Sequence, residues 1–237
     1  NQPNIGKTAR VKEYILCFAK NIESMVLGKL PLTEKAKNEY QEYEVPFLGL
    51  KFKASKDDDK ILIGDKEIEF KYSSSGIQSI VPMLMIVDYC LNQDYFSSFA
   101  LEEPEINLFP TNQLELIRFI ISKINQEKGI ENLIITTHSP YILSILNVSI
   151  LAGKIMEMKP ELTDDITTIL KPEFHLSSSE IEVFSLGKQI NGGTECESII
   201  DSSTGMIKGN YLDAVSSIIS TDFNKLNRLY IKILREQ

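Results

Sequence analysis

"SFALEEPEINLFPTNQLELIRFIISKINQEKGIENLIITTH", residues 98–138, holds two short apolar runs with a longer amphipathic run between them. The runs at 98–103 and 132–138 have the length and composition of buried strands, and 111–129 repeats apolar residues at the helical spacing. Strands separated by a helix predict a parallel sheet covered by helices, because a parallel pair needs a crossover connection. We therefore expect an α/β fold built on this sheet.

The flanking sequence predicts further helices and a second, antiparallel sheet. Before the central unit we expect helices at 8–28 and 32–43, a small antiparallel meander at 47–54, 60–66 and 67–72, and a buried helix at 77–93 interrupted by Pro82. After it we expect a helix at 139–147, a strand at 148–155, a hairpin of 180–190 with 195–207, and a closing helix at 210–234. The predicted domains are an N-terminal helical segment (1–44), the α/β core (45–160) and a C-terminal hairpin and helix extension (161–237).

Composition narrows the function classes. The net charge is −8 and the pI about 5.0, without a run rich in Lys and Arg, so no basic face of an autonomous nucleic-acid binder is evident. Cys17, Cys90 and Cys196 are widely spaced and form no metal-finger pattern. We find no apolar run of the roughly 18 to 20 residues that cross a bilayer and no signal-peptide pattern. A cytoplasmic protein without membrane contact is the expectation.

Two adjacent carboxylates stand where the first strand of the parallel sheet should end. Ligands of open parallel sheets bind beyond the carboxyl ends of strands, which is where Glu102 and Glu103 fall. Side chains alternate along a strand, so one carboxylate can face a metal ion and the other a reacting water. The alternative is a strand end whose carboxylates cap the next helix or face water.

The segment "FALEEPEINLFP", residues 99–110, resembles the Walker B and D-loop region of ABC-type ATPases. It has the Glu-Glu-Pro-Glu form found in overcoming-lysogenization (OLD) and related bacterial AAA-family ATPases. The resemblance implies a P-loop NTPase-like parallel sheet flanked by helices, with a small antiparallel β lobe. It also implies that Glu102 lies on the Mg²⁺ side, that Glu103 is the general base, and that 106–108 is the D-loop that touches a partner subunit.

Two further segments fit the same family in the order that it requires. "NLIITTHSPYIL", residues 132–143, resembles the H-loop, in which His138 would reach the γ-phosphate. "SSSGIQS", residues 73–79, resembles the signature Leu-Ser-Gly-Gly-Gln, and the resemblance implies nucleotide-binding roles for Ser75, Gly76 and Gln78. Serine replaces the leucine of the signature and isoleucine its second glycine.

The phosphate-binding loop is represented only in part. "NQPNIGKT" supplies Gly6, Lys7 and Thr8 of a Walker A loop, with Thr8 a candidate Mg²⁺ ligand, but Asn1 stands in place of the first glycine and no strand precedes it. A partial loop and an accidental match both stay open. The sequence starts at Asn1 rather than Met, so we expect a fragment, or segments, of a longer polypeptide.

The resemblance implies ATP binding and Mg²⁺-dependent ATP hydrolysis, with the nucleotide held between the subunits of a head-to-tail homodimer. The alternative is a nucleotide-sensing or scaffold module that does not hydrolyse ATP because its phosphate loop is degenerate. A role in DNA repair or phage defence, with a nuclease or DNA as partner, rests on family analogy alone.

Overall fold

The structure of the chain is a computed structural model that divides into two compact units, one ending at His138 and one beginning at Ser139. The residues that it describes are 32–45, 47–55, 57–92, 98–126, 128–186, 196–209 and 220–226. The predicted helix 8–28 and the predicted loop residues Gly6, Lys7 and Thr8 lie outside them. The domain boundaries near 45 and 160 stay a prediction.

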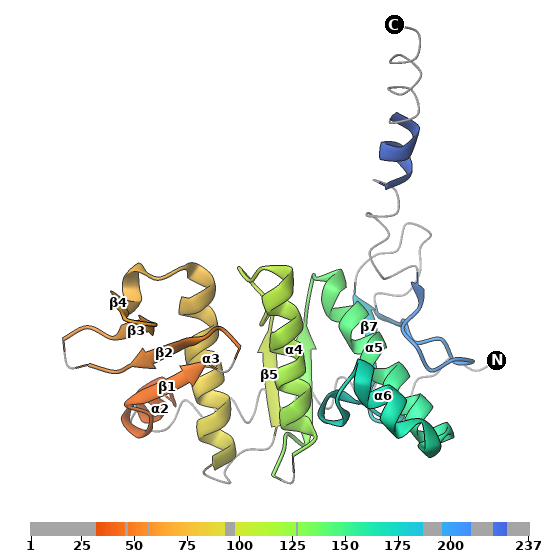
Figure 1. The fold of residues 1–237 in the computed structure, drawn as a ribbon, viewed down its shortest axis with the longest axis horizontal. Coiled ribbons are helices and arrows are strands. Elements are labelled where there is room, and N and C mark those ends of the chain that lie inside the picture. Colours follow the sequence, from red (N-terminus) through yellow and green to blue (C-terminus); the bar gives the residue numbers. More distant parts are fainter. Residues whose placement is uncertain are drawn as a thin grey trace, which may run out of the picture. The chain divides into compact units, whose positions relative to one another are not determined.

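The first unit begins with an antiparallel sheet in the order β1-β2-β3-β4 (Figure 1). Its strands are β1 (Glu42–Val45), β2 (Leu50–Lys53), β3 (Lys60–Ile63) and β4 (Lys66–Glu69). The predicted meander is confirmed, and β1 extends it by one strand. The sequence interpretation placed the first half of β1 in a helix, but Tyr43 and Val45 alternate with exposed glutamates and are buried, which is the pattern of a strand with one face on a core.

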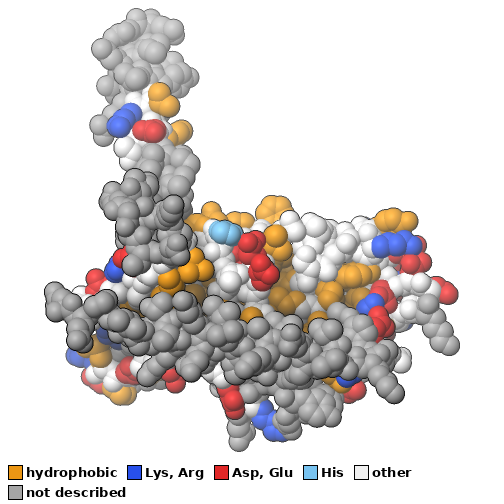
Figure 2. Space-filling view, turned by 180° about the vertical axis from the view of Figure 1, so that it is seen from behind, with side chains coloured by type: hydrophobic (Ala, Val, Ile, Leu, Met, Phe, Trp, Pro, Cys, Tyr) orange, Lys and Arg blue, Asp and Glu red, His pale blue; other side chains and the backbone are white. Residues whose placement is uncertain are grey.

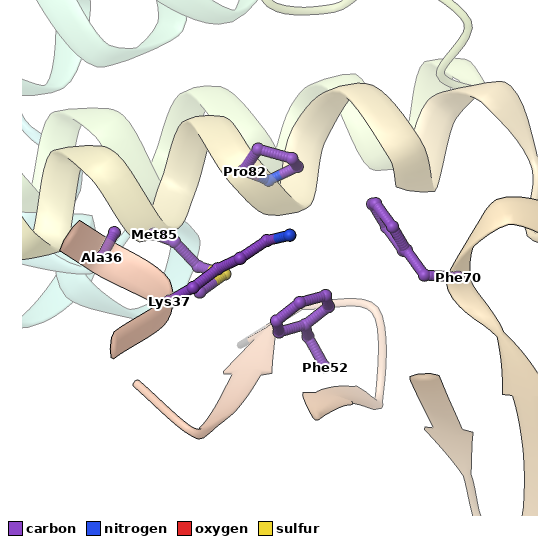
Figure 3. Close-up of a pocket in the computed structure, with 6 residues that line it drawn as sticks. All are labelled: Ala36, Lys37, Phe52, Phe70, Pro82 and Met85. Atoms are coloured by element: carbon purple, nitrogen blue, oxygen red, sulfur yellow. The ribbon is translucent and has the colours of Figure 1, made fainter. Parts of the chain in front are cut away.

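Two helices pack together beside this sheet. They are α2 (Leu32–Glu39), shorter than predicted, and α3 (Ser75–Asn92), which follows a 3-10 turn at Phe70–Tyr72. Pro82 lies inside α3, where it removes one helical N–H donor. Its ring faces Lys37 and Phe52 across a cavity of about 20 Å³, room for one water molecule (Figure 3). This cavity belongs to the packing of α2, β2 and α3 and includes none of the predicted site residues.

The predicted parallel sheet is present as the pair β5 (Ser98–Glu102) and β6 (Asn132–Thr136), joined through α4 (Pro110–Ile124). Phe99 and Leu101 of β5 are buried, whereas Ala100 and Glu102 are exposed, so the strand alternates as expected. One face of α4 supplies core side chains, namely Leu116, Ile117, Ile120 and Ile121. The mixed α/β class predicted from the sequence is thereby confirmed.

A half-buried polar network ties three elements of the first unit together. The Asp88 carboxylate on α3 accepts a hydrogen bond from the Tyr43 hydroxyl of β1 at 2.6 Å and pairs with Lys123 Nζ of α4 at 2.8 Å. Burial, followed by the Asp88 charge, raises the pKa of Tyr43, so the phenol stays a donor. Asp88 and Lys123 are only 16% and 19% exposed, so removing one partner of this pair costs more than breaking a surface ion pair.

We expect Asp88→Asn to lower the free energy of unfolding by about 1–3 kcal/mol, because Lys123 would be left half-buried without its counter-charge. Urea unfolding followed by circular dichroism measures the change. Glu115→Gln is the matched control: it breaks a 2.9 Å pair with Arg118 whose side chains are 43% and 31% exposed, and should cost less than about 1 kcal/mol. Equal losses in the two variants would contradict a special role for Asp88.

The second unit begins with one long helix, α5 (Pro140–Met158), and this corrects the prediction of a strand at 148–155. The β-branched residues of that segment suggested a strand, but Ile142, Ser149, Ile150 and Gly153 are buried at helical spacing. A Cβ on Gly153 would lie 2.2 Å from the Leu176 carbonyl oxygen, so α5 needs a glycine there to meet the following loop.

The uninterrupted α5 also meets the length and hydropathy criterion for a helix that could cross a membrane. With 19 residues and a mean hydropathy of 1.4, it is long and apolar enough to cross a bilayer by length and composition, so the statement that no apolar run reaches this length was wrong. The sequence interpretation had divided the helix at residue 148. One side of α5 packs within its own unit, where Ala152 clusters with Ile166 and Leu170, and 28% of the apolar window of the helix is buried.

The remaining elements of the second unit are short. They are the 3-10 turns Pro160–Leu162 and Pro172–Phe174, helix α6 (Thr163–Ile169), and the strands β7 (Phe184–Leu186) and β8 (Cys196–Ser198). β7 and β8 pair antiparallel, which confirms the predicted hairpin. Residues 220–226 are helical, within the predicted closing helix.

Candidate functional site

The predicted acidic pair and the predicted histidine meet at one edge of the parallel sheet. Glu102 is the last residue of β5 and lies opposite Thr136, the last residue of β6. Just beyond the two strands, Glu103 Oε1 and His138 Nε2 are 3.2 Å apart, within reach of a hydrogen bond or, with a protonated imidazole, of an ion pair. Figure 2 shows an exposed histidine against acidic side chains on the surface.

Glu103 sits in an unusual backbone conformation. Its φ of +43° lies in the left-handed region, which costs a non-glycine residue roughly 1–2 kcal/mol. Its N–H donates to the Thr136 carbonyl at 3.0 Å, so the end of β6 holds it in place. The Glu103 side chain is 36% exposed and that of His138 is 89% exposed, so both can be reached from solvent. Strain at accessible polar residues is typical of functional sites.

A tight turn follows Glu103 and includes a carboxylate that the sequence interpretation did not single out. The N–H groups of Ile106 and Leu108 donate to the carbonyls of Glu103 and Glu105 at 2.9 and 3.0 Å. Glu105 is only 6% exposed, and its Oε1 accepts a hydrogen bond from the Thr137 hydroxyl. The sequence offers two signals for this contact, namely the repeated acidic residues after the strand and the paired threonines before the histidine. Neither signal predicts the burial of Glu105, because that burial depends on tertiary packing.

The signature-like residues begin α3 and lie against the same turn. A Cβ on Gly76 would be 2.7 Å from the Asn107 carbonyl oxygen, so the start of α3 approaches this turn as closely as a glycine permits. Ser75 is the first residue of α3. The Gln78 amide donates to the carbonyls of Lys71 and Ser73 at 3.0 and 2.9 Å, which fixes the turn before the helix.

The structure therefore brings together most of the predicted site. Glu102, Glu103 and His138 share one sheet edge, and the α3 start is linked to that edge through the turn 103–108. The predicted roles of these side chains stay predictions, as do those of Ser75, Gly76 and Gln78. Gly6, Lys7 and Thr8 lie outside the described residues.

Comparison with known proteins identifies the family. A family profile described as an AAA ATPase domain matches residues 11–143, which is more than half of the chain. The chain belongs to this AAA ATPase domain family. The resemblance to bacterial AAA-family ATPases, within the P-loop NTPase class, is thereby confirmed.

Other comparisons of this AAA ATPase domain are more distant. A solved structure described as "Structural biochemistry of ATP-driven dimerization and DNA stimulated activation of SMC ATPases" aligns over 70% of this chain and 82% of its own, with 7% identity and a TM-score of 0.40. No curated protein sequence matches the chain significantly.

The donor set of this AAA ATPase domain fits a magnesium nucleotide. Among the described residues, no group of three or more His, Cys, Asp or Glu is arranged to hold a metal ion alone. Mg²⁺ usually takes only one or two protein carboxylates together with substrate phosphates, and the exposed Glu102 carboxylate at the strand end can serve as one of them.

Proposed function

We propose that this AAA ATPase domain binds Mg-ATP and hydrolyses its β-γ phosphoanhydride bond, with Glu103 as the general base. The observation that carries the proposal is the contact between Glu103 and His138 at the ends of adjacent parallel strands. In phosphoryl transfer the protein mainly positions groups and neutralises charge. A solvent-accessible carboxylate held by strained backbone beside an imidazole is suited to orienting an attacking water.

The roles of the neighbouring groups follow from this assignment. Glu102 would hold the Mg²⁺ side of the nucleotide, where the ion supplies neutralisation of the phosphate charge. His138 would contact the γ-phosphate, because its ring is exposed while it remains close to Glu103. In a head-to-tail homodimer, Ser75 and Gly76 at the start of α3 would offer N–H groups and a positive helix end to the phosphate oxygens of the nucleotide that the other subunit binds.

The test uses the full chain with Mg-ATP. We expect calorimetry to show ATP binding, and phosphate release to require Mg²⁺ and to rise more than linearly with protein concentration as dimers form. Absence of ATP binding would overturn the proposal. Tight binding without phosphate release, even at high protein concentration, would favour a nucleotide sensor instead.

A further inference from the structure

Glu105 is a buried carboxylate that the proposed reaction does not use. It is 6% exposed, and only its Oε1 has a hydrogen-bond partner, the Thr137 hydroxyl, while Oε2 has none among the described residues. Burying a carboxylate with so little compensation costs free energy, and an apolar residue of similar size would often be as stable or more so. Stability alone therefore does not explain a glutamate here.

The position of Glu105 suggests what it does. It lies two residues after Glu103, and its partner Thr137 is the residue immediately before His138. Thr137 follows the last ladder pair of the parallel sheet, so the ladder itself does not fix it. The His138 side chain is 89% exposed, so apart from its 3.2 Å contact with Glu103 its position depends mainly on its backbone.

We propose that Glu105 is a positioning residue that acts through Thr137. By accepting the hydrogen bond of the Thr137 hydroxyl, it fixes the backbone that carries His138 and so holds the imidazole against Glu103. The inference rests on the proposed function for its effect on rate, but not for its effect on the placement of the histidine.

The variants separate hydrogen bonding from charge. Thr137→Ser and Glu105→Gln each keep a hydroxyl donor and an oxygen acceptor, so both should stay close to wild type. Thr137→Val and Glu105→Leu each remove one partner. The double variant combines Thr137→Val with Glu105→Leu. It replaces both polar groups by apolar ones, which is often nearly neutral for stability. Thr168→Val is the matched control, because it removes a threonine hydroxyl that donates to the Asp165 carbonyl on α6.

We expect the double variant to unfold at nearly the wild-type urea concentration and yet to hydrolyse ATP about 10- to 100-fold more slowly, since small misplacements of reacting groups are costly. The KM for ATP should change little, and Thr137→Val alone should be as slow as the double variant because the two residues act as a unit. A loss in Glu105→Gln equal to that in Glu105→Leu would mean that the charge matters, and would overturn the inference.

A second readout does not depend on hydrolysis. The chain has two histidines, His138 and His175, so their ring resonances can be assigned by NMR. In the double variant we expect the ring resonances of His138 to shift while those of His175 stay in place. In the Thr168→Val control we expect the ring resonances of His138 to stay in place. Unchanged His138 resonances would overturn the inference. If they shift but the wild type shows no ATPase activity, only the proposed function fails.

Discussion

Replacing Glu103 by glutamine should lower phosphate release by about 10²–10⁴-fold while ATP binding is retained. Removal of a general base typically costs this much, equivalent to roughly 3–5 kcal/mol in the barrier. Glutamine matches the size of glutamate, and its amide oxygen can still lie near His138 Nε2, so the turn at 103–108 should keep its shape. Single-turnover phosphate release measures the rate, and calorimetry with Mg-ATP measures the binding.

Glu115→Gln is the control for this experiment, because it makes the same chemical change on the exposed face of α4 and should keep the wild-type rate. A slow Glu103→Gln variant should also accumulate an ATP-bound dimer, which sedimentation velocity can detect at protein concentrations where the wild type returns to monomer. Unchanged hydrolysis in Glu103→Gln would remove Glu103 from the mechanism and leave the proposed reaction without a candidate general base.

The sheet edge is predictable from the sequence because it depends on local patterns. Two apolar runs separated by a helical pattern require parallel strands, and parallel strands bring their carboxyl ends to the same edge. These patterns are enough to place Glu102, Glu103 and His138 together, and the three residues do lie at one sheet edge in the fold.

Other features were missed because long-range packing decides them. The segment after Asn147 has the β-branched residues of a strand, but its burial against Leu176 and α6 makes it part of α5. The sequence analysis did not single out Glu105, and only the fold shows that it is buried beside Thr137. Sequence periodicity cannot report a hydrogen bond between residues 32 positions apart.

Gly76→Ala should be the most damaging substitution at the start of α3. The new Cβ would lie 2.7 Å from the Asn107 carbonyl oxygen and 3.1 Å from Leu108 Cδ2, so the turn at 103–108 must move. Asn107 already has a φ of +62°, which leaves its backbone little freedom to adjust. We expect a loss of about 1–3 kcal/mol in unfolding free energy together with loss of ATPase activity. Gly209→Ala is the control, since none of the residues that the structure describes lies within 4 Å of its added Cβ.

Mixing the Gly76→Ala and Glu103→Gln proteins tests whether Gly76 acts within its own subunit. If Gly76 served only the partner's nucleotide, a mixed dimer would contain one intact site, and random pairing would restore about a quarter of wild-type activity. The contact between Gly76 and Asn107 lies within one subunit, next to that subunit's own Glu103. A displaced turn would then disable the subunit that still carries Glu103, and we expect no recovery. Recovery to a quarter would show that the contribution of Gly76 to the partner outweighs its packing against the turn.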